Sequence, residues 1–164
     1  MGAFRGKLLV AAALALLLWA SSAPADEVVP FKAFHKGFAA PVFNPDMTIS
    51  NTEVAKGVAT YLGKYTLTSD ETAVFTGPNT LHVVCKLFTL TFANGDQVFG
   101  TYETTGTVDF NTFIGVFVGE YEITGGTGRF ANATGSGTIV GVGNLQAPFE
   151  ILGAFSGTIS LPDE

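Results

Sequence analysis

The sequence predicts an all-β protein whose single domain is a small closed β-barrel behind an N-terminal signal peptide. Blocks rich in Thr, Val, Phe, Tyr, Ile and Gly follow one another from residue 54 onward and are separated by turn residues. This pattern is typical of short antiparallel strands. Two of the blocks carry aromatic side chains and glycines in alternation on one face, which a tightly coiled sheet needs in order to bend and to fill its interior. No heptad pattern and no internal repeat is present, so we expect one domain.

The composition excludes several classes of protein. Of the 164 residues, 47% are hydrophobic and only 13% are charged, so the chain is too apolar to be disordered. A formal net charge of -6 gives no electrostatic basis for binding nucleic acid or anionic lipid, and we expect neither partner. Cys85 is the only cysteine, which excludes an intramolecular disulfide and a cysteine-rich metal site.

The first 25 residues have the layout of a secretory signal peptide. Arg5 and Lys7 precede the apolar run 8–19, and Ala23 and Ala25 form an A-x-A cleavage pattern. A dozen apolar residues are short for a membrane span, which needs roughly 20. We therefore expect cleavage after Ala25, a secreted or periplasmic protein and no stable membrane span after cleavage; an uncleaved membrane anchor is the alternative.

The segment 26–53 has a different character from the rest of the cleaved chain. Pro30, Pro41 and Pro45 are interspersed with phenylalanines, and neither a 3.6-residue nor a 2-residue periodicity is sustained. We expect an irregular arm that is rich in proline and phenylalanine, with one strand at most. The exported chain from residue 26 would carry 6 basic and 14 acidic residues, a formal charge of -8.

The barrel domain is expected to occupy residues 54–164. Asn94-Gly95-Asp96 separates two long blocks, and an Asn-Gly pair accepts the positive φ angles of a tight hairpin, so those blocks should be adjacent antiparallel strands. Gly77-Pro78-Asn79 and Asp109-Phe110-Asn111 mark further turns. The expected strands are 57–68, 72–75, 81–93, 97–108, 112–124, 135–142 and 148–161.

Alternation within two strands predicts which side chains fill the barrel. In 112–124 one face carries Phe113, Gly115, Phe117, Gly119, Tyr121 and Ile123; in 148–161 it carries Phe149, Ile151, Gly153, Phe155, Gly157, Ile159 and Leu161. The other face of 112–124 is also apolar over its first half, so we expect it to be covered by another subunit or by the arm.

Few residues point to chemistry. His35 and His82 have no partner at metal-ligand spacing, so no metal and no cofactor is expected. Carboxylates inside a barrel can have a raised pKa and act as general acid or base. The candidate catalytic residues are Glu103, Glu120, Glu122 and Glu150, with solvated outward-facing side chains as the alternative.

Aromatic and small apolar side chains are the candidates for ligand contacts. Cys85 lies with Leu81, Val83 and Leu87 on one apolar face at strand spacing, which favours a buried small side chain over a nucleophile. The candidate ligand-binding residues are Phe113, Phe117, Tyr121, Phe149, Phe155, Tyr102 and Cys85.

One segment resembles a family element. Residues 121–135, YEITGGTGRFANATG, resemble the ITGGTG-x-F element of plant allene oxide cyclases, dirigent proteins and related secreted bacterial proteins, and the resemblance extends more weakly through 88–96 and 100–102. It implies an eight-stranded antiparallel barrel of calycin-like shape, often trimeric, with a cavity for an apolar small molecule. In physical terms, the glycines permit a sharp turn with positive φ, after which Phe130 can plug one end of the barrel.

Three functions are compatible with these observations. The preferred hypothesis is a secreted or periplasmic barrel that binds a small lipophilic molecule in its interior. The second is a cofactor-free cyclase or isomerase of allene oxide cyclase or dirigent type, in which a buried carboxylate polarises an apolar substrate. The third is a structural or assembly protein without a ligand. A homo-oligomer, trimer or dimer, is expected in each case.

Overall fold

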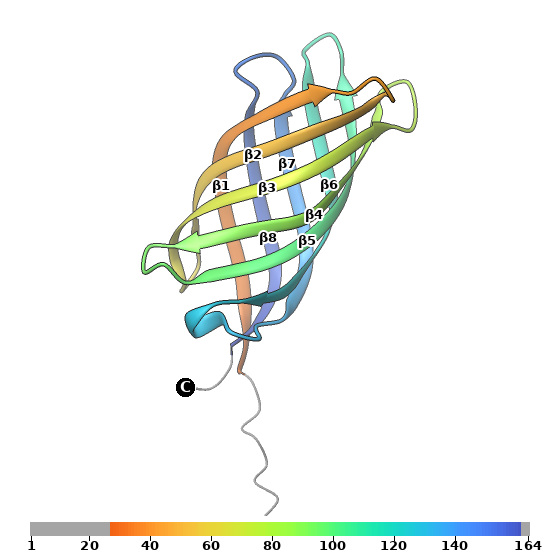
Figure 1. Cartoon of the computed structure of the whole chain (residues 1–164). Helices are drawn as coiled ribbons and strands as arrows, with labels where there is room; N and C mark the ends of the chain where they lie inside the picture. Colours follow the sequence, from red (N-terminus) through yellow and green to blue (C-terminus); the bar gives the residue numbers. More distant parts are fainter. Residues whose placement is uncertain (1–26, 162–164) are drawn as a thin grey trace, which may run out of the picture.

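The structure, a computed structural model, describes residues 27–161, which form a closed eight-stranded antiparallel β-barrel (Figure 1). Each strand pairs with its neighbour in sequence, and β1 closes the barrel by pairing with β8. This confirms the predicted fold class. The predicted signal peptide and its cleavage site lie outside the described residues. The strands are β1 (Glu27–Phe43), β2 (Thr48–Ala59), β3 (Gly63–Phe75), β4 (Thr80–Phe92), β5 (Gln97–Asp109), β6 (Ile114–Gly126), β7 (Gly135–Asn144) and β8 (Glu150–Leu161), with one 3-10 turn, η1 (Gly128–Phe130), between β6 and β7.

The prediction of an irregular arm over 26–53 is wrong, because this segment contains β1 and the first half of β2. The stagger of the barrel explains how β1 accommodates its prolines. Pro30 lies where β1 pairs only with β8, opposite Thr158, and Pro41 lies where β1 pairs only with β2, opposite Asn51. A proline lacks the N–H that a doubly paired strand requires, but it is tolerated where one side of the strand is free.

The predicted strand 57–68 is in fact two strands. Residues 60–62 form a turn, β2 ends before it and β3 begins after it, and the predicted strand 72–75 is the end of β3. Thr60 and Tyr61 are residue types that favour strands, which hides the turn in the sequence. In the structure Tyr61 has a φ of 64° and Gly63 a φ of 95°. The predicted Asn94-Gly95-Asp96 hairpin does join the antiparallel pair β4 and β5.

The two ends of the barrel differ. At the lower end in Figure 1, η1 folds under the barrel, and Phe130 is fully buried with its ring centroid 4.9 Å from that of Phe92. Gly125 and Gly128 have φ angles of 154° and 58°, so this turn uses the positive φ that the sequence predicted. The opposite end carries the four loops 44–47, 76–79, 110–113 and 145–149. Phe130 therefore closes one end, as expected.

Glycines make room for the large rings inside the barrel. A Cβ atom on Gly100 would lie 2.4 Å from the Phe88 ring, and one on Gly106 would lie 2.2 Å from the Phe117 ring. The inward faces predicted for β6 and β8 are confirmed for Tyr121, Ile123, Phe155 and Ile159, which are all buried. Phe113, predicted on the same face, instead lies in the loop before β6 and is 37% exposed. Aromatic side chains thus lie over glycines of neighbouring strands.

A β-bulge changes the pattern in β4. Cys85 pairs with Tyr102 and Phe88 pairs with Gly100, so Lys86 and Leu87 together oppose a single residue of β5. The bulge shifts the alternation by one residue, which buries Phe88 and turns Leu87 outward, where it is 51% exposed. The expectation that Leu87 shares the face of Cys85 is therefore wrong.

The outer surface carries a broad apolar area that spans five neighbouring strands. On β1 and β2, Phe34 lies opposite Val58 and Phe38 opposite Val54, and all four are more than half exposed. We call this area the outer apolar stripe; it continues on β8, β7 and β6 with Leu152, Val142, Val140, Val118 and Val116. No helix within 27–161 has the length and apolar character to cross a membrane.

Candidate functional site

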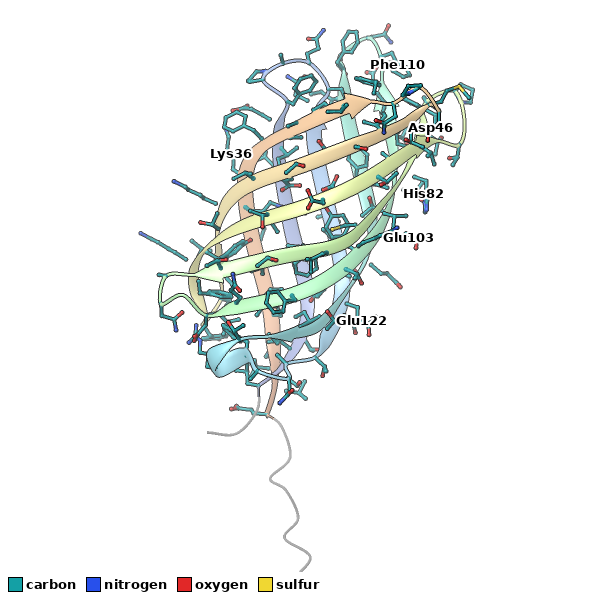
Figure 2. The ribbon with its side chains drawn as sticks, in the orientation of Figure 1. Lys36, Asp46, His82, Glu103, Phe110 and Glu122 are labelled. Carbon is teal, nitrogen blue, oxygen red and sulfur yellow. The ribbon has the colours of Figure 1, made fainter. Side chains whose placement is uncertain are left out.

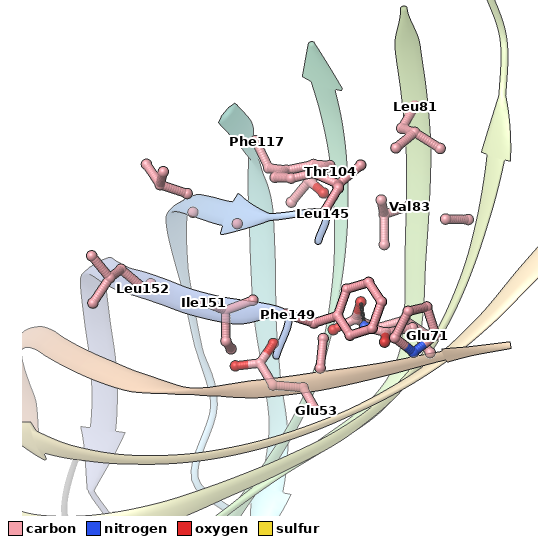
Figure 3. Close-up of a pocket in the computed structure, with 18 of the residues that line it drawn as sticks. Glu53, Glu71, Leu81, Val83, Thr104, Phe117, Leu145, Phe149, Ile151 and Leu152 are labelled. Atoms are coloured by element: carbon pink, nitrogen blue, oxygen red, sulfur yellow. Dashed lines mark hydrogen bonds between the residues drawn. The ribbon is translucent and has the colours of Figure 1, made fainter. Parts of the chain in front are cut away.

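A cavity of about 200 Å³ opens at the loop end of the barrel (Figure 3). Its walls are largely apolar, with Phe117 from β6 and Ile151 from β8 on one side and Leu81 and Val83 from β4 on another. Phe149 lies in the loop before β8, at the mouth of the cavity. A mostly apolar, pre-formed cavity with one open end is the usual form of a small-molecule site.

Polar side chains meet at the deeper end of this cavity. The cavity-lining residues Phe43 and Ile49 lie where β1 and β2 reach the open end of the barrel. His35 also lines the cavity and precedes Phe43 by eight residues on β1, so it lies deeper in the barrel. The register places His35 opposite Gly57 of β2, and Glu71 of β3 lies opposite Asn51 of β2. The cavity therefore leads from an apolar mouth to a polar floor. We call this floor the acid cluster; it consists of His35, Asn51, Glu53, Ser69, Glu71 and Tyr102.

Glu71 is the centre of one half of the acid cluster. Its Oε2 accepts a hydrogen bond from Asn51 Nδ2 at 3.0 Å, and its Oε1 accepts one from the Ser69 hydroxyl at 3.0 Å. The Tyr102 hydroxyl donates a further short hydrogen bond to Oε1. Three donors from three strands hold this carboxylate, so its position and its acceptor role are fixed.

Glu53 and His35 form the other half, which is less completely paired. Glu53 Oε1 lies 3.4 Å from His35 Nε2, but it is buried and has no aligned hydrogen-bond donor among the described residues. The other ring nitrogen of His35, Nδ1, lies 3.2 Å from the Tyr65 hydroxyl. Gly153 of β8 makes this arrangement possible, because a Cβ there would lie 2.1 Å from His35 Nε2.

Burial sets the protonation of this half of the site. Desolvation lowers the pKa of His35 to about 4, so its ring is neutral at neutral pH. Desolvation, with repulsion from Glu71 as the second cause, raises the pKa of Glu53 well above its usual value. Burial likewise raises the pKa of Tyr102, which stays a hydroxyl donor. The acid cluster thus combines a carboxylate held by three donors with a carboxyl group whose pKa is raised by burial.

A close-packed aromatic core lies below the acid cluster and closes the cavity. Phe155 is 1% exposed, and its ring centroid lies 5.5 Å from that of His35 and 5.3 Å from that of Phe88. The rings of Tyr102 and Phe88 stack at 6.1 Å. The acid cluster therefore separates the filled lower half of the barrel from the open upper half.

The four predicted catalytic glutamates all lie on the outer surface, so the structure does not support a catalytic role inside the barrel for them. Glu103 lies 3.3 Å from His82, and Glu150 lies 3.0 Å from Lys36. Figure 2 shows Glu103, His82 and Lys36 on the outside of the barrel. Glu120 and Glu122 are exposed on β6. Alternation explains this placement. Successive side chains of a strand point to opposite faces, and each of these glutamates is next in sequence to a residue that faces the interior.

The predicted ligand-binding residues separate into three groups. Phe117, Phe149 and Tyr102 line the cavity. Tyr121, Phe155 and Cys85 lie in the buried core rather than among the residues lining the cavity, and burial raises the pKa of the Cys85 thiol to about 12. Phe113 lies in the loop 110–113 at the rim and is 37% exposed.

Sequence reasoning missed the acid cluster except for Tyr102. Glu53 and Asn51 lie in the segment expected to be an irregular arm, and Ser69 and Glu71 lie between two predicted strands. One signal was available: Tyr65, Leu67, Ser69, Glu71 and Ala73 share one face at strand spacing, with apolar residues on both sides of the polar pair.

The described residues contain no group of three histidine, cysteine or acidic side chains placed to hold a metal ion. Comparison of this chain with family models, curated proteins and solved structures finds no match in any of the three.

Proposed function

We propose that this barrel binds a small lipophilic molecule in its interior. The observation that carries the proposal is the cavity of about 200 Å³, which is open at one end, has apolar walls and ends at the acid cluster. A cavity of about 150 Å³ lined by apolar side chains is large enough to bind benzene. The space in this barrel suits an apolar body of that size or somewhat larger, with further atoms extending through the mouth.

The expected localisation fits this proposal. A secreted or periplasmic barrel meets apolar molecules in water, where enclosing them removes their apolar surface from solvent. The resemblance of 121–135 to allene oxide cyclases and dirigent proteins supports the same reading, because it implies a barrel with an apolar cavity. Localisation and family both stay predictions.

A fluorescent binding assay tests the proposal. N-phenyl-1-naphthylamine is apolar, uncharged at neutral pH and bright only in an apolar environment. A Cβ on Gly143 would have its nearest neighbour at 3.6 Å, Ile151 Cγ2, so Gly143→Leu should fill the cavity without a backbone clash. We expect the dye to bind the wild-type protein and to lose at least tenfold in affinity in Gly143→Leu.

The matched control addresses the outer apolar stripe, which also attracts dye. Phe38→Ser removes an exposed ring from that stripe and leaves the interior unchanged. Dye binding that survives Gly143→Leu and disappears in Phe38→Ser would contradict binding inside the barrel.

A second candidate function is supported by the acid cluster. A carboxyl group that keeps its proton beside a fixed carboxylate can polarise a substrate oxygen, as a cofactor-free cyclase or isomerase requires. The residues that would do this are Glu53 and Glu71, in place of the four outer glutamates. Cyclisation of a short-lived epoxide tests the idea: the wild type should give an optically enriched product and Glu53→Gln a racemic one, as in the absence of protein.

The outer apolar stripe supports the expected self-association. Side chains on five adjacent strands leave an apolar area exposed in a single chain, and such areas usually mark contact surfaces. We propose that copies of this chain meet there. Native mass spectrometry should show a dimer or trimer that Phe38→Lys converts to a monomer, and a monomeric wild type would refute it. A stable oligomer with an empty cavity would favour a purely structural role.

A further inference from the structure

The acid cluster carries negative charge and lacks a cationic partner. Two carboxyl groups, Glu53 and Glu71, lie within it, and no lysine or arginine is among the residues that line the cavity in the described part of the chain. His35 is the only basic side chain at the cavity floor. A buried carboxylate is normally balanced by a cation or by several donors. Here three donors serve Glu71, and no donor among the described residues reaches Glu53 Oε1.

The acid cluster also has acceptors left over. Asn51 Nδ2, the Ser69 hydroxyl and the Tyr102 hydroxyl all donate to Glu71. Asn51 Oδ1 and Glu53 Oε1 are buried and find no donor among the described residues. Glu53 is 8% exposed and lines the cavity (Figure 3). Two acceptor oxygens of the floor, Glu53 Oε1 and Asn51 Oδ1, therefore have no donor from a neighbouring side chain, and no lysine or arginine lines the cavity in the described residues.

We infer that the molecule bound in this cavity is a lipophilic primary amine, with its ammonium group between Glu53 and Glu71 and its hydrocarbon body among the apolar walls. This inference rests on the proposed binding function and specifies the head group of the ligand. An ammonium group has three donors and no acceptor, which matches the unpaired oxygens of Glu53 and Asn51 and the charge of Glu71. A hydroxyl group has a single donor, and a carboxylate has none and would be repelled.

The rest of the molecule favours the same charge. The chain has a formal net charge of -6, so its field attracts cations and repels anions at the mouth of the cavity. The volume of about 200 Å³ suits an aromatic ring with a short side arm. We therefore choose 2-phenylethylamine as the probe, with 2-phenylethanol and phenylacetate as partners of the same shape and different charge.

Binding of an ammonium group should release a proton from the protein. Glu53 holds its proton in the empty cavity because of burial and the neighbouring Glu71, and a cation beside it favours ionisation. An alcohol brings no charge and should release none. The ionisable groups that influence Glu53 come from four other strands: His35 from β1, Tyr65 and Glu71 from β3, Cys85 from β4 and Tyr102 from β5.

Isothermal titration calorimetry with the three probes tests the inference. Titrations in two buffers of different ionisation enthalpy count the protons released. We expect 2-phenylethylamine to bind at least tenfold more tightly than 2-phenylethanol and to release a proton, and phenylacetate to bind at least tenfold more weakly than the alcohol. Glu53→Gln should weaken amine binding at least tenfold and abolish proton release, and it should weaken alcohol binding by a clearly smaller factor than amine binding. The matched control is Glu103→Gln, which removes an outer carboxylate and should change nothing.

The outcomes separate the inference from the proposed function. Alcohol or carboxylate binding as tight as amine binding, or amine binding without proton release, overturns the inference while the barrel remains a binding protein. The same holds if N-phenyl-1-naphthylamine enters the cavity and the amine does not displace it. If neither the dye nor any of the three probes binds, the proposed function itself fails. If Glu53→Gln does not fold, the wild-type titrations alone still show whether the amine binds more tightly than the alcohol and whether it releases a proton.

Discussion

The pH dependence of stability offers a direct test of the buried pair His35 and Glu53. The side chain of His35 is 4% exposed, and desolvation lowers its pKa from 6.5 to about 4. Between these values the unfolded chain binds more protons than the folded one, so the folded state loses stability as pH falls. The difference between the His35 pKa values of the unfolded and folded states corresponds to about 3 kcal/mol of free energy of unfolding. About 2 kcal/mol of this should be lost as the pH falls from about 7 to about 5.

Glu53 titrates in the opposite sense. Its pKa is raised in the folded state, so above its ordinary value the folded chain binds more protons than the unfolded one. Its contribution to stability is present at low pH and is lost as pH rises. In the wild type the two effects oppose each other as the pH falls from about 7 to about 5, so the loss of stability should be smaller than the loss from His35 alone.

The variant Glu53→Gln separates the two effects. Glutamine keeps the shape of the protonated carboxyl group and cannot titrate, so the loss from His35 should appear alone. Urea unfolding followed by far-UV circular dichroism should show about 2 kcal/mol less stability at about pH 5 than at about pH 7. Above about pH 7 the variant should gain stability relative to the wild type, because the cost of ionising Glu53 is gone.

The double variant His35→Gln/Glu53→Gln is the control. It removes both groups and keeps the partly exposed His82, so any slope it retains does not come from the buried pair. A double variant as steep as Glu53→Gln, or a flat profile for Glu53→Gln itself, would refute a buried neutral His35.

Three further expectations concern packing. Phe130→Ala removes the fully buried plug of the closed end and should lower the free energy of unfolding by about 3–5 kcal/mol in urea titrations; a loss under about 1 kcal/mol would mean that this end is not closed by Phe130. The Cys85 thiol, with its pKa raised by burial to about 12, should react with a disulfide reagent only in denaturant, and rapid labelling of the folded protein would contradict its burial. Gly106→Ala places a Cβ 2.2 Å from the Phe117 ring and should destabilise by about 1–3 kcal/mol. In contrast, Gly141→Ala has its nearest neighbour at 3.6 Å and should be tolerated, so equal thermal shifts for the two would argue against ring-over-glycine packing.

Local patterns were enough to predict much of the barrel. The alternation in 112–124 and 148–161 correctly predicted the inward faces of β6 and β8, because a strand repeats every two residues whatever its neighbours are. The Asn94-Gly95 pair correctly predicted the β4–β5 hairpin, since turn preference is a property of the residues in the turn. Phe130 was recognised as the plug from the glycines that precede it.

Other features depend on contacts between distant parts of the chain. Prolines suggested that 26–53 is irregular, but Pro30 and Pro41 fit into β1 because the barrel's stagger leaves each of them paired on one side only. The bulge at Lys86 and Leu87 is defined by the partner strands and reverses the facing of the residues after it. Neither effect has a signature in a short stretch of sequence.

The sequence by itself determined that this chain is an all-β barrel with one glycine-supported closed end, because strand period, turn preference and ring-glycine alternation act over a few residues. Only the tertiary structure decided which inward-facing polar groups meet. Glu53 of β2 and Glu71 of β3 are separated in sequence from His35 of β1 and Tyr102 of β5, and the closed barrel brings the four side chains together at one level. The candidate site therefore arises from the register of the closed barrel, a property of all eight strands together.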